Sequence, residues 1–302
     1  MNPRLRTDPT VRLRALLAGS PPLPALTPTR YAETHAVWEA ASDQRSRLRD
    51  WLVAELPRRV EHVRGRPVAV LGVGVGDGSV DGPLAAALAA GGRRVDYVGV
   101  EPHPPSAGAF ASRLANLGLP ALTVTTQVTD FASDFGTGPV DLVHFVHSLY
   151  YVADVGAALD RALDRLAPGG TLVALTAPRD PLCVLTELMA PRTGHRQWFA
   201  EDVTAALAGR GRTVRAATID GRLDLGAVAA DPDGTGEQLL DFLVQARTRD
   251  LPAPARELVL AHLRAIRLPG PGWVVPHPLQ VAIVTRSAVD APRPVPIGGP
   301  GR

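Results

Sequence analysis

The sequence has 302 residues, of which 45% are hydrophobic and 21% are charged, and its formal net charge at neutral pH is +2. This length and apolar content suffice for one large α/β domain with an added segment, and they exclude a chain that is disordered throughout. The arginines are spread along the sequence without forming a basic stripe, which argues against nucleic acid as a partner.

The single cysteine, Cys183, excludes an intramolecular disulfide and a cysteine-based metal cluster. We therefore expect a reducing, cytoplasmic setting. No stretch approaches the roughly 20 apolar residues that span a bilayer, so we expect no membrane partner. The histidines show no ligand spacing, and we expect no metal. A monomer and a homodimer both remain open.

The two ends of the chain are expected to be loose. Residues 1–28 have a basic start and a proline-rich end, which favours a flexible arm, and residues 289–302 form a tail rich in proline and glycine. We place the folded domain at 29–288. It begins with N-terminal helices over 29–62, in which the helical stretch Tyr31 to Leu56 breaks near Ser42.

The stretch Arg66 to Gly78, RPVAVLGVGVGDG, predicts a buried strand that feeds a ligand-binding loop. Its apolar run lacks polar alternation, as in a parallel strand that is covered on both faces. Glycines at 72, 74, 76 and 78 permit backbone conformations and close ligand approach that a side chain would block. A helix is predicted from Asp81 to Ala90, so the loop lies between strand and helix.

The glycine spacing narrows the ligand class. A dinucleotide fingerprint needs glycine or alanine where this chain has Asp77 or Ser79, and a P-loop needs a lysine that is absent here. What remains is G-x-G-x-G followed by an acid, the loop pattern of Rossmann-like methyltransferases that use S-adenosylmethionine (SAM). A turn with a purely structural role remains the alternative.

Two acids follow predicted strands on the same side of the sheet. The second strand, 94–100, ends on Glu101, where a carboxylate can accept hydrogen bonds from both ribose hydroxyls of a nucleoside. A third strand over 122–126 leads to Asp130, which either contacts an adenine amine or caps a turn.

The remaining strands complete a doubly wound α/β fold with a mostly parallel, Rossmann-like seven-stranded sheet. They are expected at 140–146, 171–176, 212–219 and 280–286, with helices at 154–166 and 201–208 between them. The exit of the strand at 140–146, His147 to Tyr151, faces the ligand because ligands gather at the carboxyl ends of parallel strands. Residues 221–278, with helices at 235–248 and 253–266, form an inserted helical subdomain, which we expect to make the substrate side together with 29–62.

The chain resembles the class I SAM-dependent methyltransferases and, within them, is similar to the histamine N-methyltransferases. The likeness runs from about Tyr31 to Arg286. It rests on YAETHAVWEAASDQ, LGVGVGDG, the Glu101-Pro102 pair, HSLYYVAD, WFAEDV and LLDFL.

The resemblance implies SAM as cofactor and assigns site residues by position. Cofactor contacts are implied for Gly72, Gly74, Gly76, Glu101, Ser106, Asp130, Val146 and His147. Substrate contacts are implied for Gln44, His147, Tyr150, Tyr151 and His277. Gln44, His147 and His277 stand where the resembled enzymes have a glutamate, a glutamine and an asparagine. These differences imply that the site has lost a negative charge, and we expect the protein to turn over histamine poorly or not at all.

His147, His277 and Tyr150 are the candidate catalytic residues, since a neutral imidazole can take a proton and an aromatic face can contact a cation. A purely structural role for these residues, in hydrogen bonding or packing at the pocket wall, is the alternative. We expect methyl transfer from SAM to a nitrogen of a small molecule, an amine, an imidazole or an amino-acid-like compound, in specialised metabolism. O-methylation, and SAM binding without turnover, are the alternatives.

Overall fold

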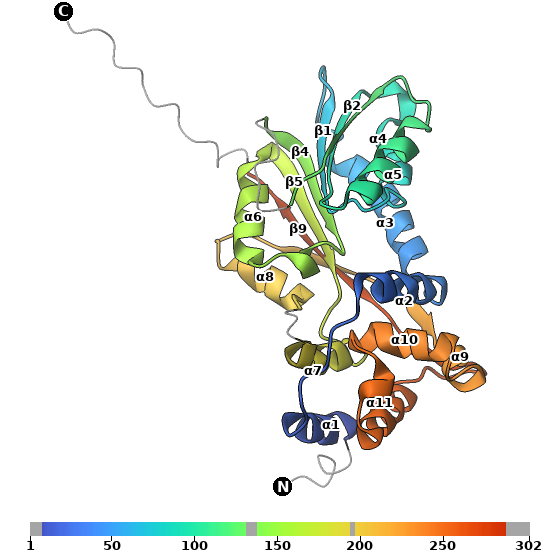
Figure 1. The fold of residues 1–302 in the computed structure, drawn as a ribbon. Helices are drawn as coiled ribbons and strands as arrows, with labels where there is room; N and C mark the ends of the chain where they lie inside the picture. Colours follow the sequence, from blue (N-terminus) through green and yellow to red (C-terminus); the bar gives the residue numbers. More distant parts are fainter. Residues whose placement is uncertain (1–7, 131–137, 194–196, 288–302) are drawn as a thin grey trace, which may run out of the picture.

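The computed structural model describes residues 8–130, 138–193 and 197–287. It consists of a twisted sheet covered by helices on both faces and a group of helices below one end of the sheet (Figure 1). The predicted tail 289–302 and the first seven residues of the predicted arm lie outside the described residues.

The sheet has seven strands in the order β3-β2-β1-β4-β5-β9-β6. Their bounds are β1 Val68–Val73, β2 Val95–Val100, β3 Leu122–Gln127, β4 Val140–Val146, β5 Leu166–Thr176, β6 Arg215–Ile219 and β9 Leu279–Thr285. All neighbours are parallel except β9, which runs antiparallel to both β5 and β6. The predicted Rossmann-like, mostly parallel seven-stranded sheet is confirmed.

Helices cover the two faces of the sheet because each presents an apolar stripe to it. One face carries α3 (Gln44–Arg59), α4 (Asp81–Leu88) and α5 (Pro104–Ala115), and the other carries α6 (Val155–Asp164) and α8 (Ala200–Ala208). In α3, Leu48, Leu52 and Leu56 recur every four residues and are fully buried. The helix continues through Pro57 and ends at Arg59, slightly beyond the predicted end at Leu56.

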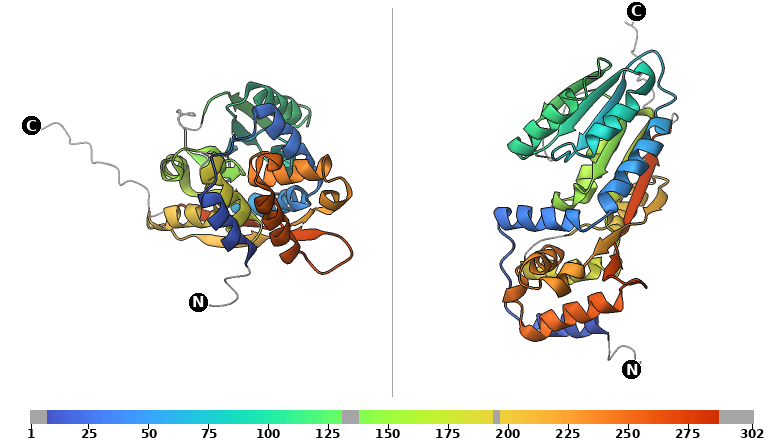
Figure 2. Two further views of the ribbon diagram at one scale, coloured as in Figure 1. Left: turned by 60° about the horizontal axis from the view of Figure 1, so that its bottom comes forward. Right: turned by 90° about the vertical axis from the view of Figure 1, so that its right-hand side faces the viewer.

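The helices below the sheet form a separate hydrophobic cluster, which we call the helical subdomain (Figure 2). It contains α1 (Pro9–Ala18), α2 (Pro28–Ala40), α7 (Cys183–Thr193), α9 (Gly226–Ala230), α10 (Thr235–Val244), α11 (Ala253–Ala265) and the strand pair β7 (Arg222–Asp224) and β8 (Val274–Pro276). Short 3-10 helices lie at Ala90–Gly92, Leu149–Tyr151 and Thr248–Asp250. The insertion at 221–278 and α2 thus share one core. Helix α7 belongs to the same core and was not predicted from the sequence.

The expectation of a flexible arm over 1–28 is wrong for residues 9–18, which form α1. Asp8 caps this helix by accepting a hydrogen bond from the Thr10 backbone N–H at 2.8 Å. Leu13 and Leu17 lie on one face and are buried in the helical subdomain, a contribution of roughly 1.5 to 3 kcal/mol each. The prolines at 21–28 therefore belong to a connection between two packed helices rather than to a loose end.

None of the helices within the described ranges is long and apolar enough to cross a membrane.

Candidate functional site

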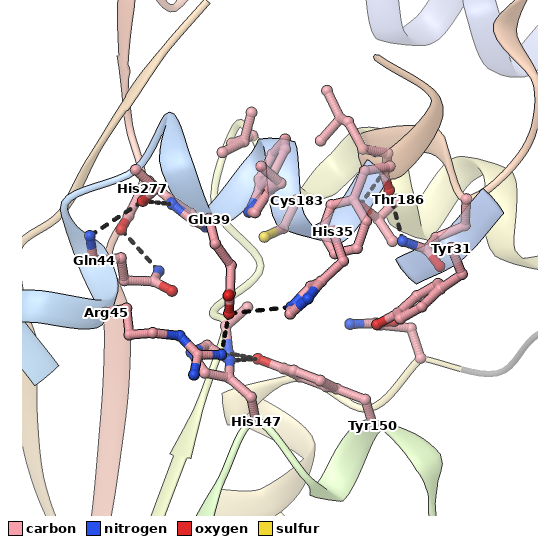
Figure 3. A pocket seen from close by; sticks show the side chains of 18 of the residues that line it. Tyr31, His35, Glu39, Gln44, Arg45, His147, Tyr150, Cys183, Thr186 and His277 are labelled. Atoms are coloured by element: carbon pink, nitrogen blue, oxygen red, sulfur yellow. Dashed lines mark hydrogen bonds and ion pairs between the residues drawn. The ribbon is translucent and has the colours of Figure 1, made fainter. Parts of the chain in front are cut away.

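Two adjoining cavities lie where the carboxyl ends of the parallel strands meet the helical subdomain. The larger, about 910 Å³, follows the glycine loop and the ends of β1, β2 and β4, and we call it the cofactor cavity. The smaller, about 150 Å³, is enclosed by α2, α7, α10 and the turn before β9, and we call it the acceptor chamber (Figure 3). The residues that line both are Tyr31, His35, Glu39, Arg45, His147 and Tyr151.

The glycine loop forms one wall of the cofactor cavity. Gly74 and Gly76 line it with φ values of +67° and +55°, in the left-handed region that favours glycine. A Cβ at Gly76 would meet no protein atom within 4 Å, so this backbone faces open space. Gly72 does not line the cavity, because a Cβ there would come within 2.9 Å of the His144 ring, and its glycine serves internal packing.

Glu101 lies at the end of β2 with 8% of its surface exposed, and its carboxylate is fixed by the backbone. Oε2 accepts a hydrogen bond from Gly76 N–H at 2.9 Å, and Oε1 accepts one from His103 N–H at 3.0 Å. These contacts tie the glycine loop to β2 and hold the carboxylate at the cavity wall. Carboxylate oxygens accept several hydrogen bonds, so acceptor capacity remains for a ligand.

The other predicted cofactor residues, Ser106, Asp130, Val146 and His147, also line the cofactor cavity. Two buried polar atoms of lining residues lack a protein partner among the described residues, Oγ of Ser148 and Nδ1 of His144. Unpaired buried polar atoms are costly, and a polar ligand can satisfy them. The cofactor cavity thus offers open glycine backbone, a carboxylate after β2 and unpaired polar atoms. These groups together suit the polar and nucleoside parts of SAM.

Sequence reasoning missed a buried polar group beneath the glycine loop. The Tyr97 hydroxyl donates a hydrogen bond to the Asp81 carboxylate at 2.7 Å, and its oxygen lies 2.7 Å from Nε2 of His144. Burial and the neighbouring Asp81 raise the pKa of Tyr97. The three residues come from α4, β2 and β4, so no local pattern links them in the sequence.

His147 lies where the cofactor cavity meets the acceptor chamber. Its Nδ1 is 3.1 Å from the Tyr150 hydroxyl, which accepts a hydrogen bond from the Ala177 backbone N–H at 2.6 Å. Burial, and then the positive charge of Arg45, lower the pKa of His147 to about 3. Its backbone φ of +54° is uncommon for a residue other than glycine and is typical of functional sites. The imidazole is therefore uncharged at neutral pH and fixed in orientation.

His277 and Gln44 lie on the opposite wall of the acceptor chamber (Figure 3). His277 Nδ1 is 2.8 Å from the Ser42 hydroxyl, and burial lowers its pKa to about 4. The Gln44 amide nitrogen donates to the backbone carbonyls of His277 and Pro278, at 2.9 and 3.2 Å. Gln44 thus positions the turn that carries His277.

The two tyrosines after β4 differ in their surroundings. Tyr150 lines only the acceptor chamber, whereas Tyr151 lines both cavities and is 63% exposed. The Tyr151 hydroxyl forms a hydrogen bond with the Tyr31 hydroxyl, which connects α2 to the end of β4.

The acceptor chamber contains a carboxylate that the sequence analysis missed. Glu39 of α2 forms an ion pair with Arg45 of α3 and lies 3.3 Å from Nε2 of His35. Glu39 thus places a carboxylate at a different position from Gln44, and the guanidinium of Arg45 balances its charge. Burial and the nearby Arg45 lower the pKa of His35, although Glu39 opposes this change.

Aromatic rings form much of the remaining wall. Phe242 of α10 packs against Tyr31, His35 and Trp38, with ring centroids 5.2 to 5.5 Å apart. Cys183 and Thr186 come from α7. Across the part of the chain that the structure describes, no group of three or more histidine, cysteine or acidic side chains is arranged to hold a metal ion.

Comparison with known proteins agrees with this geometry. A family model described as a methyltransferase domain matches residues 71–172, from the glycine loop through β5. Histamine N-methyltransferase B of Xenopus laevis is 23% identical over 270 residues, covering 79% of this chain and 88% of that protein. Histamine N-methyltransferase of Xenopus tropicalis is 24% identical and covers 78% and 87%, respectively.

Solved structures share the fold. The YcgJ protein from Bacillus subtilis has a TM-score of 0.53 at 14% identity, covering 79% of this chain and 99% of that one. The plantazolicin methyltransferase BpumL has a TM-score of 0.51 at 10% identity and covers 94% and 96%.

Proposed function

We propose that this chain, a class I SAM-dependent methyltransferase, transfers a methyl group from SAM to a nitrogen of a small molecule. The observation that carries the proposal is the position of His147, an uncharged imidazole at the junction of the cofactor cavity and the acceptor chamber. The similarity to histamine N-methyltransferases supports nitrogen as the acceptor atom and an amine, an imidazole or an amino-acid-like compound as the acceptor class.

The cofactor supplies a methyl group on a positively charged sulfur, so the protein's task is to align an acceptor that has a free lone pair. Positioning of this kind accounts for much of the rate of such reactions. Glu101 and the backbone of Gly74 and Gly76 would hold the cofactor, with Ser106 and Asp130 at the same side of the cavity.

His147 and His277 are placed to accept a hydrogen bond from an N–H group of the acceptor. Both are uncharged at neutral pH, because their pKa values lie well below the ordinary value for histidine. A neutral imidazole within reach of an N–H group can accept its hydrogen bond and so orient the acceptor nitrogen, whereas pKa values this far below neutral make it a weak general base. Tyr150 then acts as a positioning residue that fixes the ring of His147.

The aromatic wall and Glu39 support a nitrogen-containing acceptor. Tyr31, Trp38 and Phe242 present flat apolar surfaces that stack on a planar ring or contact a positive charge. Gln44 is engaged with backbone carbonyls and Glu39 with Arg45, an arrangement that differs from the one implied for the resembled enzymes. Because these polar contacts differ, we infer that histamine itself is a poor substrate. A role in specialised metabolism is a further part of the proposal and does not follow from these contacts.

The test is a screen with radiolabelled SAM over amines, imidazoles, amino acids and phenols. We expect transfer to one or more nitrogen compounds and poor transfer to histamine. Transfer to phenols or carboxylates alone would establish the O-methyltransferase alternative. SAM binding by calorimetry without transfer to any acceptor class would favour a SAM-binding protein without turnover.

A further inference from the structure

A positively charged side chain, that of Arg45, lies at one end of the cofactor cavity. The cofactor contacts assigned so far, the glycine loop and the acids after β2 and β3, give this side chain no role. Arg45 of α3 lines this cavity and donates a hydrogen bond from Nη1 to the Ser79 hydroxyl at 2.8 Å. Ser79 follows the glycine loop directly, just before α4. The guanidinium therefore lies beside the loop and not on the outer surface of α3.

The cavity has chemically distinct ends. Glu101 and Asp130 follow β2 and β3, on one side of β1, and this is the side where ribose hydroxyls bind in open α/β sheets. Arg45 and His147 lie toward β4, on the other side of β1, where the acceptor chamber begins. SAM has an adenosine at one end and an amino-acid group at the other, with the transferable methyl between them. If the adenosine occupies the β2–β3 side, the amino-acid group faces Arg45.

The charges around Arg45 suit an amino-acid group, which carries both signs. Asp77 forms an ion pair with Arg113 at 2.8 Å, and Asp81 accepts a hydrogen bond from the Tyr97 hydroxyl. Neither carboxylate therefore neutralises the charge of Arg45 by direct contact. Glu39 is its one ion-pair partner among the described residues. Arg45 has five N–H donors, and its bonds to Ser79 and Glu39 leave donors for a carboxylate.

We propose that Arg45 binds the carboxylate of the amino-acid end of SAM and so fixes the cofactor against the acceptor chamber. Arg161 is the other arginine among the described lining residues of the cofactor cavity. It belongs to α6 and does not line the acceptor chamber. The position of Arg161 is thus the less suitable of the two for a group next to the transferred methyl.

The test measures binding alone, so it does not depend on an acceptor. Calorimetry compares S-adenosylhomocysteine, which keeps the amino-acid carboxylate, with methylthioadenosine, which lacks the amino-acid group. Arg45→Met should weaken the first by roughly 10- to 100-fold, as for lost hydrogen bonds to a charged group, and leave the second unchanged. Methionine keeps the apolar stem, and an unchanged melting temperature shows that the variant is folded.

Two matched control variants test whether the selective loss is specific to Arg45. Arg47→Met removes a neighbouring arginine of α3 that pairs with Asp43 and lines neither cavity, and it should change neither affinity. Arg161→Met should show no selective loss for S-adenosylhomocysteine. The proposal is overturned if Arg45→Met weakens both ligands equally or neither, if Arg161→Met produces the selective loss instead, or if the wild type binds no S-adenosylhomocysteine. Failure of methyl transfer in the acceptor screen would leave this result unaffected.

Discussion

Nδ1 of His147 lies 3.1 Å from the hydroxyl oxygen of Tyr150, at the point where the cofactor cavity meets the acceptor chamber. The same hydroxyl accepts the backbone N–H of Ala177, at the end of β5. The carboxyl ends of two neighbouring strands thus fix the orientation of one imidazole, and that imidazole is uncharged because burial lowers its pKa to about 3.

Removal of the Tyr150 hydroxyl tests this positioning role. Tyr150→Phe leaves His147 without its partner and the Ala177 N–H unpaired, which costs about 1 to 3 kcal/mol of folding free energy. We expect kcat to fall about 10-fold, less than the roughly 10²- to 10⁴-fold that a general acid or base itself contributes, while the Kd for SAM is unchanged. Steady-state kinetics and calorimetry on the same preparation measure both quantities. An unchanged kcat would exclude a positioning role for Tyr150.

The two histidines of the chamber should matter mainly for the acceptor. We expect His147→Ala and His277→Ala to lose acceptor affinity or turnover, because both side chains line the acceptor chamber. His277→Ala should retain SAM affinity fully, whereas His147 also lines the cofactor cavity, so its loss should weaken SAM binding less than it weakens the acceptor step. Acceptor KM and kcat, measured beside the calorimetric Kd for SAM, separate these effects. Full activity in both variants would show that neither imidazole takes part.

Glu101 is predicted to bind the ribose of the cofactor. Glu101→Ala should weaken SAM binding by roughly 1.5 to 3 kcal/mol, the range for hydrogen bonds to a charged group. Glu101→Gln serves as the control for shape, since it keeps an acceptor oxygen and removes the charge. Because the carboxylate also holds Gly76 and His103, the melting temperature of each variant is measured as well. Wild-type affinity in Glu101→Ala would place the ribose elsewhere.

Gly76 and Gly118 form a matched pair for testing the glycine loop. Both have positive φ, +55° and +62°, and a Cβ at either position meets no atom within 4 Å. Alanine should therefore destabilise the fold by a similar amount at each site, about 1 to 2 kcal/mol. Only Gly76→Ala should weaken SAM binding, because Gly76 lines the cofactor cavity and Gly118 does not. Equal SAM affinity in the two variants would contradict a cofactor role for this loop.

The buried imidazole of His277 should make the fold sensitive to acid. Its pKa is about 4 in the folded protein, against about 6.5 for an unperturbed histidine, so the unfolded chain binds more protons between these values. The contribution of the neutral His277 side chain to the free energy of unfolding is fully present above pH 6.5. It is lost as the pH falls toward 4, by up to about 1.4 kcal/mol per pH unit. Urea denaturation at several pH values should show a shallower decline for His277→Asn than for the wild type. Parallel curves would indicate that His277 titrates normally in the folded state.

Much of the fold was predictable because its signals are local. The strand Val140–Val146 is a mostly apolar run that contains Asp141 and His144 as its polar residues, and the break between α2 and α3 falls where we expected it, near Ser42. Helix α1 also had local signals, a capping Asp8, Pro9 at its first turn and Leu13 and Leu17 one turn apart, but the prolines at 21–28 concealed them.

The missed site residues depend on tertiary contacts. Glu39 and Arg45 occur in helices that carry several other charged residues, and they become site residues only because α2 and α3 close over the ends of β1 and β4. His144 lies within a buried strand, and its partners Asp81 and Tyr97 come from other elements. Sequence spacing does not report such contacts, whereas Glu101 was found because a strand end is a local feature.

The most direct test of the proposed function identifies the atom that receives the methyl group. SAM with a ¹³C-labelled methyl is incubated with the best acceptor from the screen, and the product is analysed by NMR, in which N-methyl and O-methyl carbons have different chemical shifts. We predict that the label is on nitrogen with the wild type and is strongly reduced with His147→Ala. A label on oxygen, or the same N-methylated product at the same rate with His147→Ala, would contradict the account.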